Sequence, residues 1–517
     1  MDGHHVDLAI IGGGLGGVAA ALAACEKGLS VILTEETEWI GGQVTSQGVP
    51  PDEHPWIEEF GATGRYKLYR RKVRDAYRRI MKVVDDGKAL NPGNGLVSAI
   101  CHDPRVTLHV LQELLLPFQL TGHLTVLVNA TPVKVEKQGR RVEKVWISSG
   151  GRLTGIEAPY YIDATETGDL LPLAEISYVT GAESKEDTGE PHALEAADPL
   201  DIQAFTYVLG MEYREGGYHV IPEPDMYTFW RDFQPGIWPD KLLSFFAPHP
   251  ITKEKRAYSL FDGGMGFPLW AYRRILDPSL FRLKDGIGEV TLMNWPQNDY
   301  FLGNVYDVNK AEKEKNLYQA KQLSLSLLYW LQTEAPREDG GRGYPGLKLR
   351  KDLFMTEDGL AKAPYIRESR RIKAEYTVVE QDVSPDFSTG PTGTRFPDRV
   401  GVGSYSIDLH PSMKGRTYLD IKALPFYIPF GALIPKDTDN LLAGCKNIGT
   451  THITNGCFRL HPVEWNIGEA GGAAVAFCLK HDLNPRQLRE NRMDQFQDVL
   501  RQDGFELEWP WPNNKEE

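Results

Sequence analysis

Three glycines near the N-terminus, Gly12, Gly14 and Gly17, have the spacing G-x-G-x-x-G and follow an apolar stretch directly. The first glycine of such a pattern allows a sharp turn, the second allows a backbone to approach a pyrophosphate, and the third lets a helix pack closely on a strand. The alanine-rich stretch 18–27 predicts that helix. The first N–H groups of that helix, beginning at Leu15, and the positive end of its dipole would both attract a phosphate. The pattern therefore predicts binding of a phosphate-bearing ligand.

Two acids, Glu35 and Glu36, end the next apolar stretch, 30–34. A carboxylate about 20 residues beyond the glycines accepts a hydrogen bond from a ribose hydroxyl and repels a 2′-phosphate. Strand, glycine turn, helix, second strand and terminal acid occur here in that order. Together they predict a bound dinucleotide with these two acids at its ribose. The alternative is a Rossmann-like turn that binds nothing.

Later stretches repeat this combination of apolar strands and small residues. They are Gly41-Gly42-Gln43, the strand 160–163 that continues to Thr165 and Asp169, the strand that ends at Gly444 with Asn447 after it, and the helix 464–481 with Gly468 in its first half. An ordinary Gly-Gly turn also explains the first. Glycine costs about 1 kcal/mol in a helix relative to alanine. Its frequency in 464–481 therefore implies close approach of another backbone or a cofactor.

Seven side chains are candidates for proton transfer or anion binding. For handling a proton or orienting a substrate they are His410, His452, His461 and Tyr427, and for binding an anionic group they are Arg367, Arg371 and Arg459. Asp408 and His410 fall on one face of a predicted strand, as an orienting group and a base would, although a hydrogen-bonded polar face is the alternative. Arg367 and Arg371 lie close together in the sequence and cannot both be buried without acidic partners. Glu368 and Glu375 are nearby acids that could pair with them.

Composition limits the class of protein. The chain has 517 residues, a net charge of −14 and 41% hydrophobic residues. The negative charge argues against nucleic acid and anionic membrane as partners. The sequence contains neither a run of 18 apolar residues nor a signal peptide, so we expect a cytoplasmic protein. A homo-oligomer stays an open alternative.

The five cysteines are scattered and form no C-x-x-C motif, so neither a dithiol of that kind nor an iron–sulfur run is predicted. We expect Cys25 and Cys478 in the core and leave open a redox pair of Cys445 and Cys457. We predict no metal site.

The elements that must position these residues predict an α/β fold with two intertwined domains. A discontinuous Rossmann-like domain would comprise residues 1–50, 95–175 and 420–485. An inserted α+β substrate or cap domain, rich in tryptophan and tyrosine, would comprise 51–94 and 176–419, followed by a tail, 486–517. The basic helix predicted at 66–84 is expected to have a solvated face.

The motifs together resemble the FAD-dependent oxidoreductase family of two-dinucleotide-binding flavoproteins, which is related to flavoproteins of the heterodisulfide reductase and fumarate reductase types. Gly-Gly-Gln at 41–43, Asp-Ala-Thr at 163–165, the arginine-rich stretch 364–371 and the stretch 443–462 carry this resemblance. It covers nearly the whole chain. It implies noncovalent FAD, with Gly42 and Gln43 beside the ribityl and pyrophosphate and Val133 near the adenine. The pair Glu166-Thr167 departs from the pattern.

This resemblance implies hydride transfer between a small organic substrate and flavin N5, with a protein group handling the proton. One alternative is a flavin-dependent monooxygenase supplied with reduced flavin or an external reductant, although a second nucleotide-binding unit is not evident. Another is an electron-transferring subunit of a larger complex, against which the lack of cluster-binding cysteines counts. A flavin-dependent RNA modifier is disfavoured by the acidic balance.

Overall fold

A five-stranded parallel sheet forms the centre of the first part of the protein. The computed structural model describes residues 3–84, 89–264, 266–283, 286–415 and 418–511. The strands lie in the order β22 (Leu441–Ala443), β8 (Tyr160–Asp163), β2 (Leu8–Ile11), β3 (Val31–Thr34) and β4 (Leu124–Leu127). The apolar, fully buried strands are typical of a parallel sheet covered on both faces. The predicted α/β, Rossmann-type class is confirmed at this level.

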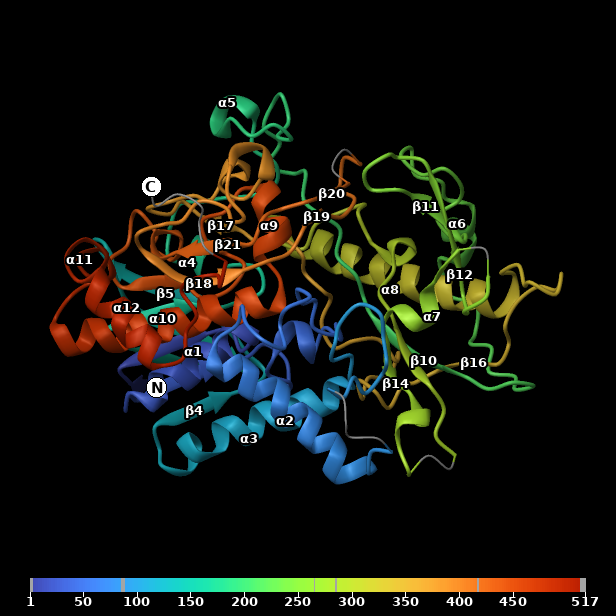
Figure 1. Ribbon diagram of the computed structural model, residues 1–517, viewed down its shortest axis with the longest axis horizontal. Helices are drawn as coiled ribbons and strands as arrows, with labels where there is room; N and C mark the ends of the chain where they lie inside the picture. The colour runs from blue at the N-terminus through green and yellow to red at the C-terminus, as the bar shows by residue number, and fades with distance from the viewer. Residues whose placement is uncertain (1–2, 85–88, 265, 284–285, 416–417, 512–517) are drawn as a thin grey trace.

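Two helices that are far apart in the sequence lie side by side at this sheet (Figure 1). They are α1 (Leu15–Glu26) and α10 (His461–His481). A Cβ added at Gly468 would lie 1.9 Å from the carbonyl oxygen of Gly16, and one at Gly472 would lie 2.3 Å from that of Ala20. The glycines of α10 therefore serve the close approach of another backbone.

The remaining elements of this part surround the sheet. They are α2 (Gly64–Met81), α3 (Pro104–Leu120), α4 (Leu170–Leu173), α5 (Lys185–Thr188), α9 (His452–Phe458), α11 (Pro485–Asn491), α12 (Met493–Gln502), the sheet β1 (Gly3–His5), β7 (Arg152–Glu157), β6 (Arg141–Ser149) and β5 (Ala130–Gln138), and the pairs β9 (Tyr178–Val179) with β17 (Arg371–Ile372), β18 (Arg399–Gly403) with β21 (Phe426–Pro429), and β19 (Ile407–Leu409) with β20 (Leu419–Ile421). A short 3₁₀ turn, η1 (Gly42–Val44), also belongs to this part, whereas η3 (Pro296–Asn298) packs on α8 (Lys310–Thr333).

A second hydrophobic core, rich in aromatic residues, extends from Ile202 to Ile366. Its elements lie to the right in Figure 1, away from α1 and α10. They are the sheet β14 (Arg274–Leu276), β15 (Val290–Met293), β10 (Leu209–Tyr213) and β16 (Leu347–Leu349), the strands β11 (Phe246–Pro248), β12 (Lys255–Ser259) and β13 (Phe267–Pro268), and the helices α6 (Tyr227–Asp232), α7 (Leu269–Tyr272) and α8 (Lys310–Thr333). The predicted aromatic core is present.

The chain leaves this second core earlier than the predicted boundary at residue 419. Ile372, Val400 and Ile407 already belong to the first core. The same core contains Phe496 and Leu500 of α12, within the segment expected to form a tail. Residues 512–517 of that segment lie outside the described residues.

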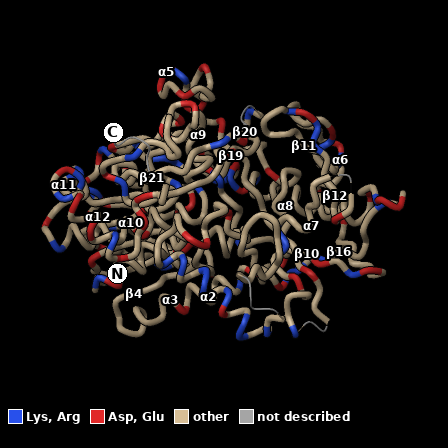
Figure 2. Tube along the Cα trace, in the orientation of Figure 1, with Lys and Arg blue, Asp and Glu red and all other residues tan. Residues whose placement is uncertain are grey.

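The basic helix α2 does not present a uniformly solvated face. Arg70 and Arg74 are buried, and both donate hydrogen bonds to Glu58. Arg70 also binds Glu53 through Nε at 2.8 Å. Acidic residues lie among the basic ones across the trace in Figure 2. The expectation of a solvated face is wrong for these two arginines, because acids from the loop 53–58 fold over the helix.

All five cysteines are buried and free, so Cys445 and Cys457 form no disulfide. Burial raises the pKa of the Cys25, Cys101 and Cys478 thiols to about 12. We therefore expect the native protein to react negligibly with Ellman's reagent at pH 8 over minutes, because the thiolate is the reactive form. The same protein unfolded in guanidinium should release five equivalents of chromophore. Rapid reaction of a native thiol would contradict this expectation.

Candidate active site

The glycine turn has a backbone that only glycine allows. Gly12 has φ +105°, and a Cβ there would lie 2.2 Å from the carbonyl carbon of Ala164. At Gly17 a Cβ would lie 2.0 Å from the carbonyl oxygen of Gly12. Gly14 is the N-cap of α1 and provides no side-chain cap. The end of β2, the end of β8 and the start of α1 are thereby held together around the N-terminus of that helix, which suits a phosphate.

A cavity opens at this turn. Its walls are Gly12, Gly14, Thr34, Glu35, Glu36, Ala130, Thr131, Pro132, Ala164, Thr165, Glu166 and Asp169. It thus brings together six of the residues predicted to bind the cofactor. Val133 follows Pro132 in β5 but does not line the cavity. Burial, with a further contribution from Glu36, raises the pKa of Glu35 to about 8, while Thr37 hydroxyl and amide groups donate to its carboxylate.

Two other residues predicted to bind the cofactor, Gly444 and Asn447, pack against the glycine turn on the side away from the cavity. A Cβ added at Gly16 would lie 2.0 Å from the carbonyl oxygen of Gly444, so the end of β22 packs directly on α1. The Asn447 side-chain amide donates to the Asp163 carbonyl at 3.0 Å. Together with Gly468, these residues shape the cavity through backbone packing.

A chain of polar contacts leads from this cavity toward the second core. Buried Lys446 forms ion pairs with Glu166 and, at 3.6 Å, with Glu464. Glu464 accepts a hydrogen bond from Gln43, and Gln43 also donates to the Arg459 carbonyl at 3.1 Å. The glycine pair before Gln43 lies against the first turn, since a Cβ at Gly42 would be 3.0 Å from the Gly14 Cα.

Buried polar atoms without partners follow the same path. Among the described residues these are Gln43 Oε1, Glu166 Oε1, Arg459 Nε and His461 Nε2. Leaving such an atom unpaired costs about 1–3 kcal/mol. Donors and acceptors in this arrangement fit a long polar ligand such as FAD, whose pyrophosphate would lie at the glycine turn and whose ring carbonyls would meet the arginine and histidine donors.

His461 is held as a neutral donor. Its Nδ1 accepts the backbone N–H of Asp52 at 2.9 Å. Burial, aided by Arg273 and Arg459, keeps the pKa of His461 well below its usual value. The neutral ring therefore carries its hydrogen on Nε2, the unpaired atom, and can donate it to a ligand.

The path ends at a second cavity of about 300 Å³. Its lining comprises Asp52, Pro250, Arg256, Tyr258, Phe267, Leu269, Tyr272, Arg273, Asn294, Trp295, Pro296, Tyr365, Tyr405, Ser406, Asp408, His410, Tyr418, Asp420 and Arg459. Burial raises the pKa of Tyr258 and Tyr365, so these phenols stay neutral donors. We call this cavity the aromatic pocket.

His410 lies in the aromatic pocket between two carboxylates. Its Nδ1 is 2.5 Å from Asp299 Oδ2, and its Nε2 is 3.5 Å from Asp408 Oδ2. Against the opposing effect of burial, Arg367 and His410 lower the pKa of Asp299. Against the same effect, His410 and Arg459 hold the pKa of Asp408 well below its usual range. A carboxylate thus lies at each nitrogen of the ring and fixes its orientation.

Two arginines of the aromatic pocket are buried. Arg459 donates to the Tyr365 hydroxyl at 2.7 Å and to Asp408 at 3.1 Å. Arg273, which the sequence reasoning missed, lies 3.7 Å from Asp52 and leaves Nε and Nη1 without hydrogen bonds. Buried guanidinium donors that stay unpaired suit an anionic ligand.

The other predicted catalytic residues lie outside the lining of the aromatic pocket. Arg367 binds Asp299 at 2.9 Å and so supports His410 indirectly. Arg371 pairs with Glu368, and His452 Nδ1 lies 3.0 Å from the same carboxylate. Although burial opposes it, Glu368 raises the pKa of His452. These contacts give the three residues partners within the protein.

Two further expectations need comment. Tyr427 is buried in an aromatic cluster with Phe396 and Trp509, away from the aromatic pocket. Glu375, expected to pair with the arginines at 367–371, instead binds Arg486 at 2.6 Å. The expectation is wrong because the chain changes direction after β17 and places Glu375 beside α11, which contains Arg486.

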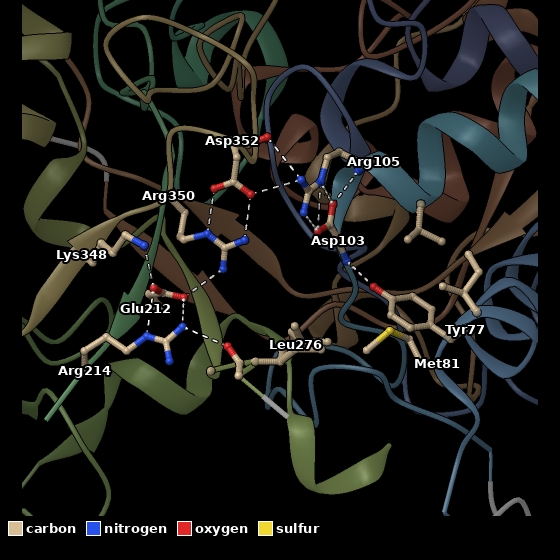
Figure 3. Close-up of a pocket in the computed structure, with 15 residues that line it drawn as sticks. Tyr77, Met81, Asp103, Arg105, Glu212, Arg214, Leu276, Lys348, Arg350 and Asp352 are labelled. Atoms are coloured by element: carbon tan, nitrogen blue, oxygen red, sulfur yellow. Dashed lines mark hydrogen bonds and ion pairs between the residues drawn. The ribbon is translucent and has the colours of Figure 1, made fainter. Parts of the chain in front are cut away.

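A larger surface cleft lies between α2, α3 and the β10–β16 edge (Figure 3). Glu212 accepts hydrogen bonds from Arg214, Lys348 and Arg350, and Arg350 also binds Asp352. Because its charged groups satisfy one another, this cleft has no polar group prepared for a ligand, unlike the aromatic pocket.

In the described part of the chain, every helix is too short or too polar to span a bilayer. Within the same residues, no group of three or more histidine, cysteine and acidic side chains is arranged so that it could hold a metal ion.

Comparison with known proteins found structural similarity to L-proline dehydrogenase from P. horikoshii (20% identity, 35% of this chain, 24% of that chain, TM-score 0.19). It also found the Mycobacterium smegmatis Sdh1 complex (14% identity, 41% of this chain, 42% of that chain, TM-score 0.23). A third similar structure is a geranylgeranyl bacteriochlorophyll reductase-like protein from Thermoplasma acidophilum (10% identity, 98% of this chain, 85% of that chain, TM-score 0.30). The chain spans less than half the length of the first two. No curated protein sequence matched.

The family model for FAD dependent oxidoreductases matches residues 7–500. That range contains the glycine turn, the polar path and the aromatic pocket. The chain therefore belongs to the FAD dependent oxidoreductase family.

Proposed function

We propose that the enzyme transfers a hydride between a small organic anion and the flavin, with His410 handling the accompanying proton. The observation that carries this proposal is the position of His410. Its ring lies between Asp299 and Asp408 in a pocket that also contains the unsatisfied donors of Arg273. A base, one of its two orienting acids (Asp408) and an anion-binding group therefore line one cavity.

The glycine turn, Glu35, Gln43 and His461 would hold the cofactor along the polar path. Bound FAD would supply the hydride acceptor or donor. The second core, 202–366, would then contribute a wall of the substrate-binding pocket. This core is a part of the predicted substrate domain on which the proposal depends.

The substrate anion would bind to Arg273, whose Nε and Nη1 groups have no hydrogen-bond partner, although Nη1 lies 3.7 Å from Asp52. Arg459 donates to Tyr365 and Asp408 and so fixes the neighbouring wall. Neutral tyrosine hydroxyls offer further donors. His410 lines the same pocket, with its Nε2 3.5 Å from Asp408, and would take a proton from a substrate hydroxyl or amine, or return it. The surrounding rings exclude water from the reacting carbon.

Anaerobic absorbance of the FAD-loaded protein tests the proposal. We would add 2-hydroxy acids and 2-amino acids, each matched with its neutral amide or alcohol, and NADH in parallel. We expect one organic acid to bleach the flavin spectrum, and its neutral analogue to do so at least tenfold more slowly, because the analogue loses the arginine contacts. Equal rates for acid and neutral analogue would contradict an anionic substrate. Bleaching by NADH alone would favour the monooxygenase alternative.

A further inference from the structure

Arg256 lies in the aromatic pocket and takes no part in the proposed chemistry. It lies in β12, where the parallel pairing of Tyr258 with Phe267 puts two rings beside it. Its guanidinium lies 5.4 Å from the Tyr258 ring centroid and 5.3 Å from that of Phe267. Arg256 is half-buried. Among the described residues, no carboxylate lies within ion-pair distance of its guanidinium. It is a cation held by rings alone.

Arg273 occupies the opposite end of the same wall. Its guanidinium lies 4.9 Å from the Tyr272 ring centroid, and the Tyr272 and Phe267 centroids are 5.2 Å apart. The order along the wall is therefore Arg273, Tyr272, Phe267, Arg256. All four residues line the one cavity. Two cations are thus separated by a surface of two aromatic rings.

The acidic residues that line the pocket do not neutralise both guanidinium groups, Arg273 and Arg256. Asp408 is engaged by His410 and Arg459. Asp52 lies at the Arg273 end at 3.7 Å, and burial raises its pKa despite that cation. Burial also raises the pKa of Asp420, although the charge of Arg256 has a weaker opposing effect, and Asp420 is not within ion-pair distance of Arg256. The guanidinium of Arg256 is therefore available to a second anionic group of a ligand.

We infer that the substrate is an elongated dianion, with one carboxylate at Arg273, a planar apolar body along the Tyr272–Phe267 wall, and a second carboxylate at Arg256. This inference rests on the proposed function for the first carboxylate. Arg256 would then determine specificity by favouring dianions over monoanions, since carboxylate–guanidinium contacts are bidentate and charge-assisted. The rings that hold it also match a flat ligand body.

Benzoate and terephthalate are suitable probes because they share one aromatic body and differ in the second carboxylate. Their dissociation constants for the FAD-loaded enzyme would be measured from perturbation of the flavin absorbance. We expect terephthalate to bind at least tenfold more tightly than benzoate. In Arg256→Gln this preference should disappear while benzoate affinity stays within about twofold. Lys255→Gln, on the neighbouring position of β12, should leave both constants unchanged.

The outcomes separate this inference from the proposed function. Equal affinity of the wild-type enzyme for the two probes, or equal weakening of both by Arg256→Gln, would overturn the role of Arg256 while leaving an anion site at Arg273. Failure of both probes to bind any variant would overturn the anion site itself. Arg256→Lys should restore part of the preference, and FAD content should show that each variant is folded.

Discussion

Gly468→Ala should yield little folded, FAD-loaded protein. The added methyl group would lie 1.9 Å from the carbonyl oxygen of Gly16. A backbone atom cannot move aside as a side chain does, so α1 and α10 would have to separate. Overpacking of a core costs typically 1–3 kcal/mol, and we expect this rigid contact to exceed that range. The glycine turn begins α1, so separation also displaces the phosphate-binding N–H groups.

The same helix provides a matched control. A Cβ at Gly471 would meet only Ile162 Cδ1, at 3.5 Å, which is ordinary contact. Gly471→Ala should therefore be neutral, or stabilise the protein by up to about 1 kcal/mol through helix propensity. Urea unfolding midpoints and FAD content after purification measure both variants. Equal stability of the two would refute the close packing of α1 and α10.

His410→Gln should slow flavin reduction by the organic acid identified above by about 10²- to 10⁴-fold, the range expected for loss of a general base. The glutamine amide keeps hydrogen-bonding capacity toward Asp299 but cannot carry a proton between substrate and water. Because Arg273 and the aromatic wall are unchanged, benzoate affinity should change by less than about threefold. Stopped-flow reduction under anaerobic conditions measures the rate.

His123→Gln serves as its control, since His123 is exposed and its side chain forms a hydrogen bond with the neighbouring Thr121. We expect its reduction rate to equal that of the wild type. A fall of less than tenfold in His410→Gln, with FAD content intact, would assign the proton to another group. Loss of FAD from His410→Gln would instead indicate a structural role.

Local signals in the sequence predicted the cofactor side of the protein well. Glycine spacing, apolar strands and a terminal acid are all encoded within about 35 residues, and Gly12, Gly14 and Glu35 do meet at one cavity. The helix expected at 464–481 begins only three residues earlier, at His461. Such features depend on neighbours in the chain, so periodicity and spacing are sufficient to find them.

The substrate side depends on contacts between distant segments, which periodicity does not encode. Asp299, at the end of η3, meets His410 across more than one hundred residues. Arg273 looked like any other basic residue beside a tyrosine until the fold placed it against Asp52. The aromatic crowding of 230–330 was the available signal, because pockets favour aromatic walls, but it did not distinguish pocket from core.

The pairing of α1 with α10 also has a consequence for synthesis on the ribosome. β2, α1 and β3 emerge first, whereas β22 and α10 follow only after residue 440. At about 5–20 residues per second, the nascent chain waits tens of seconds for the partner of its first helix. During that time the small-residue face of α1 has no native cover. Cofactor loading is consequently a late event, completed after the last helices leave the exit tunnel.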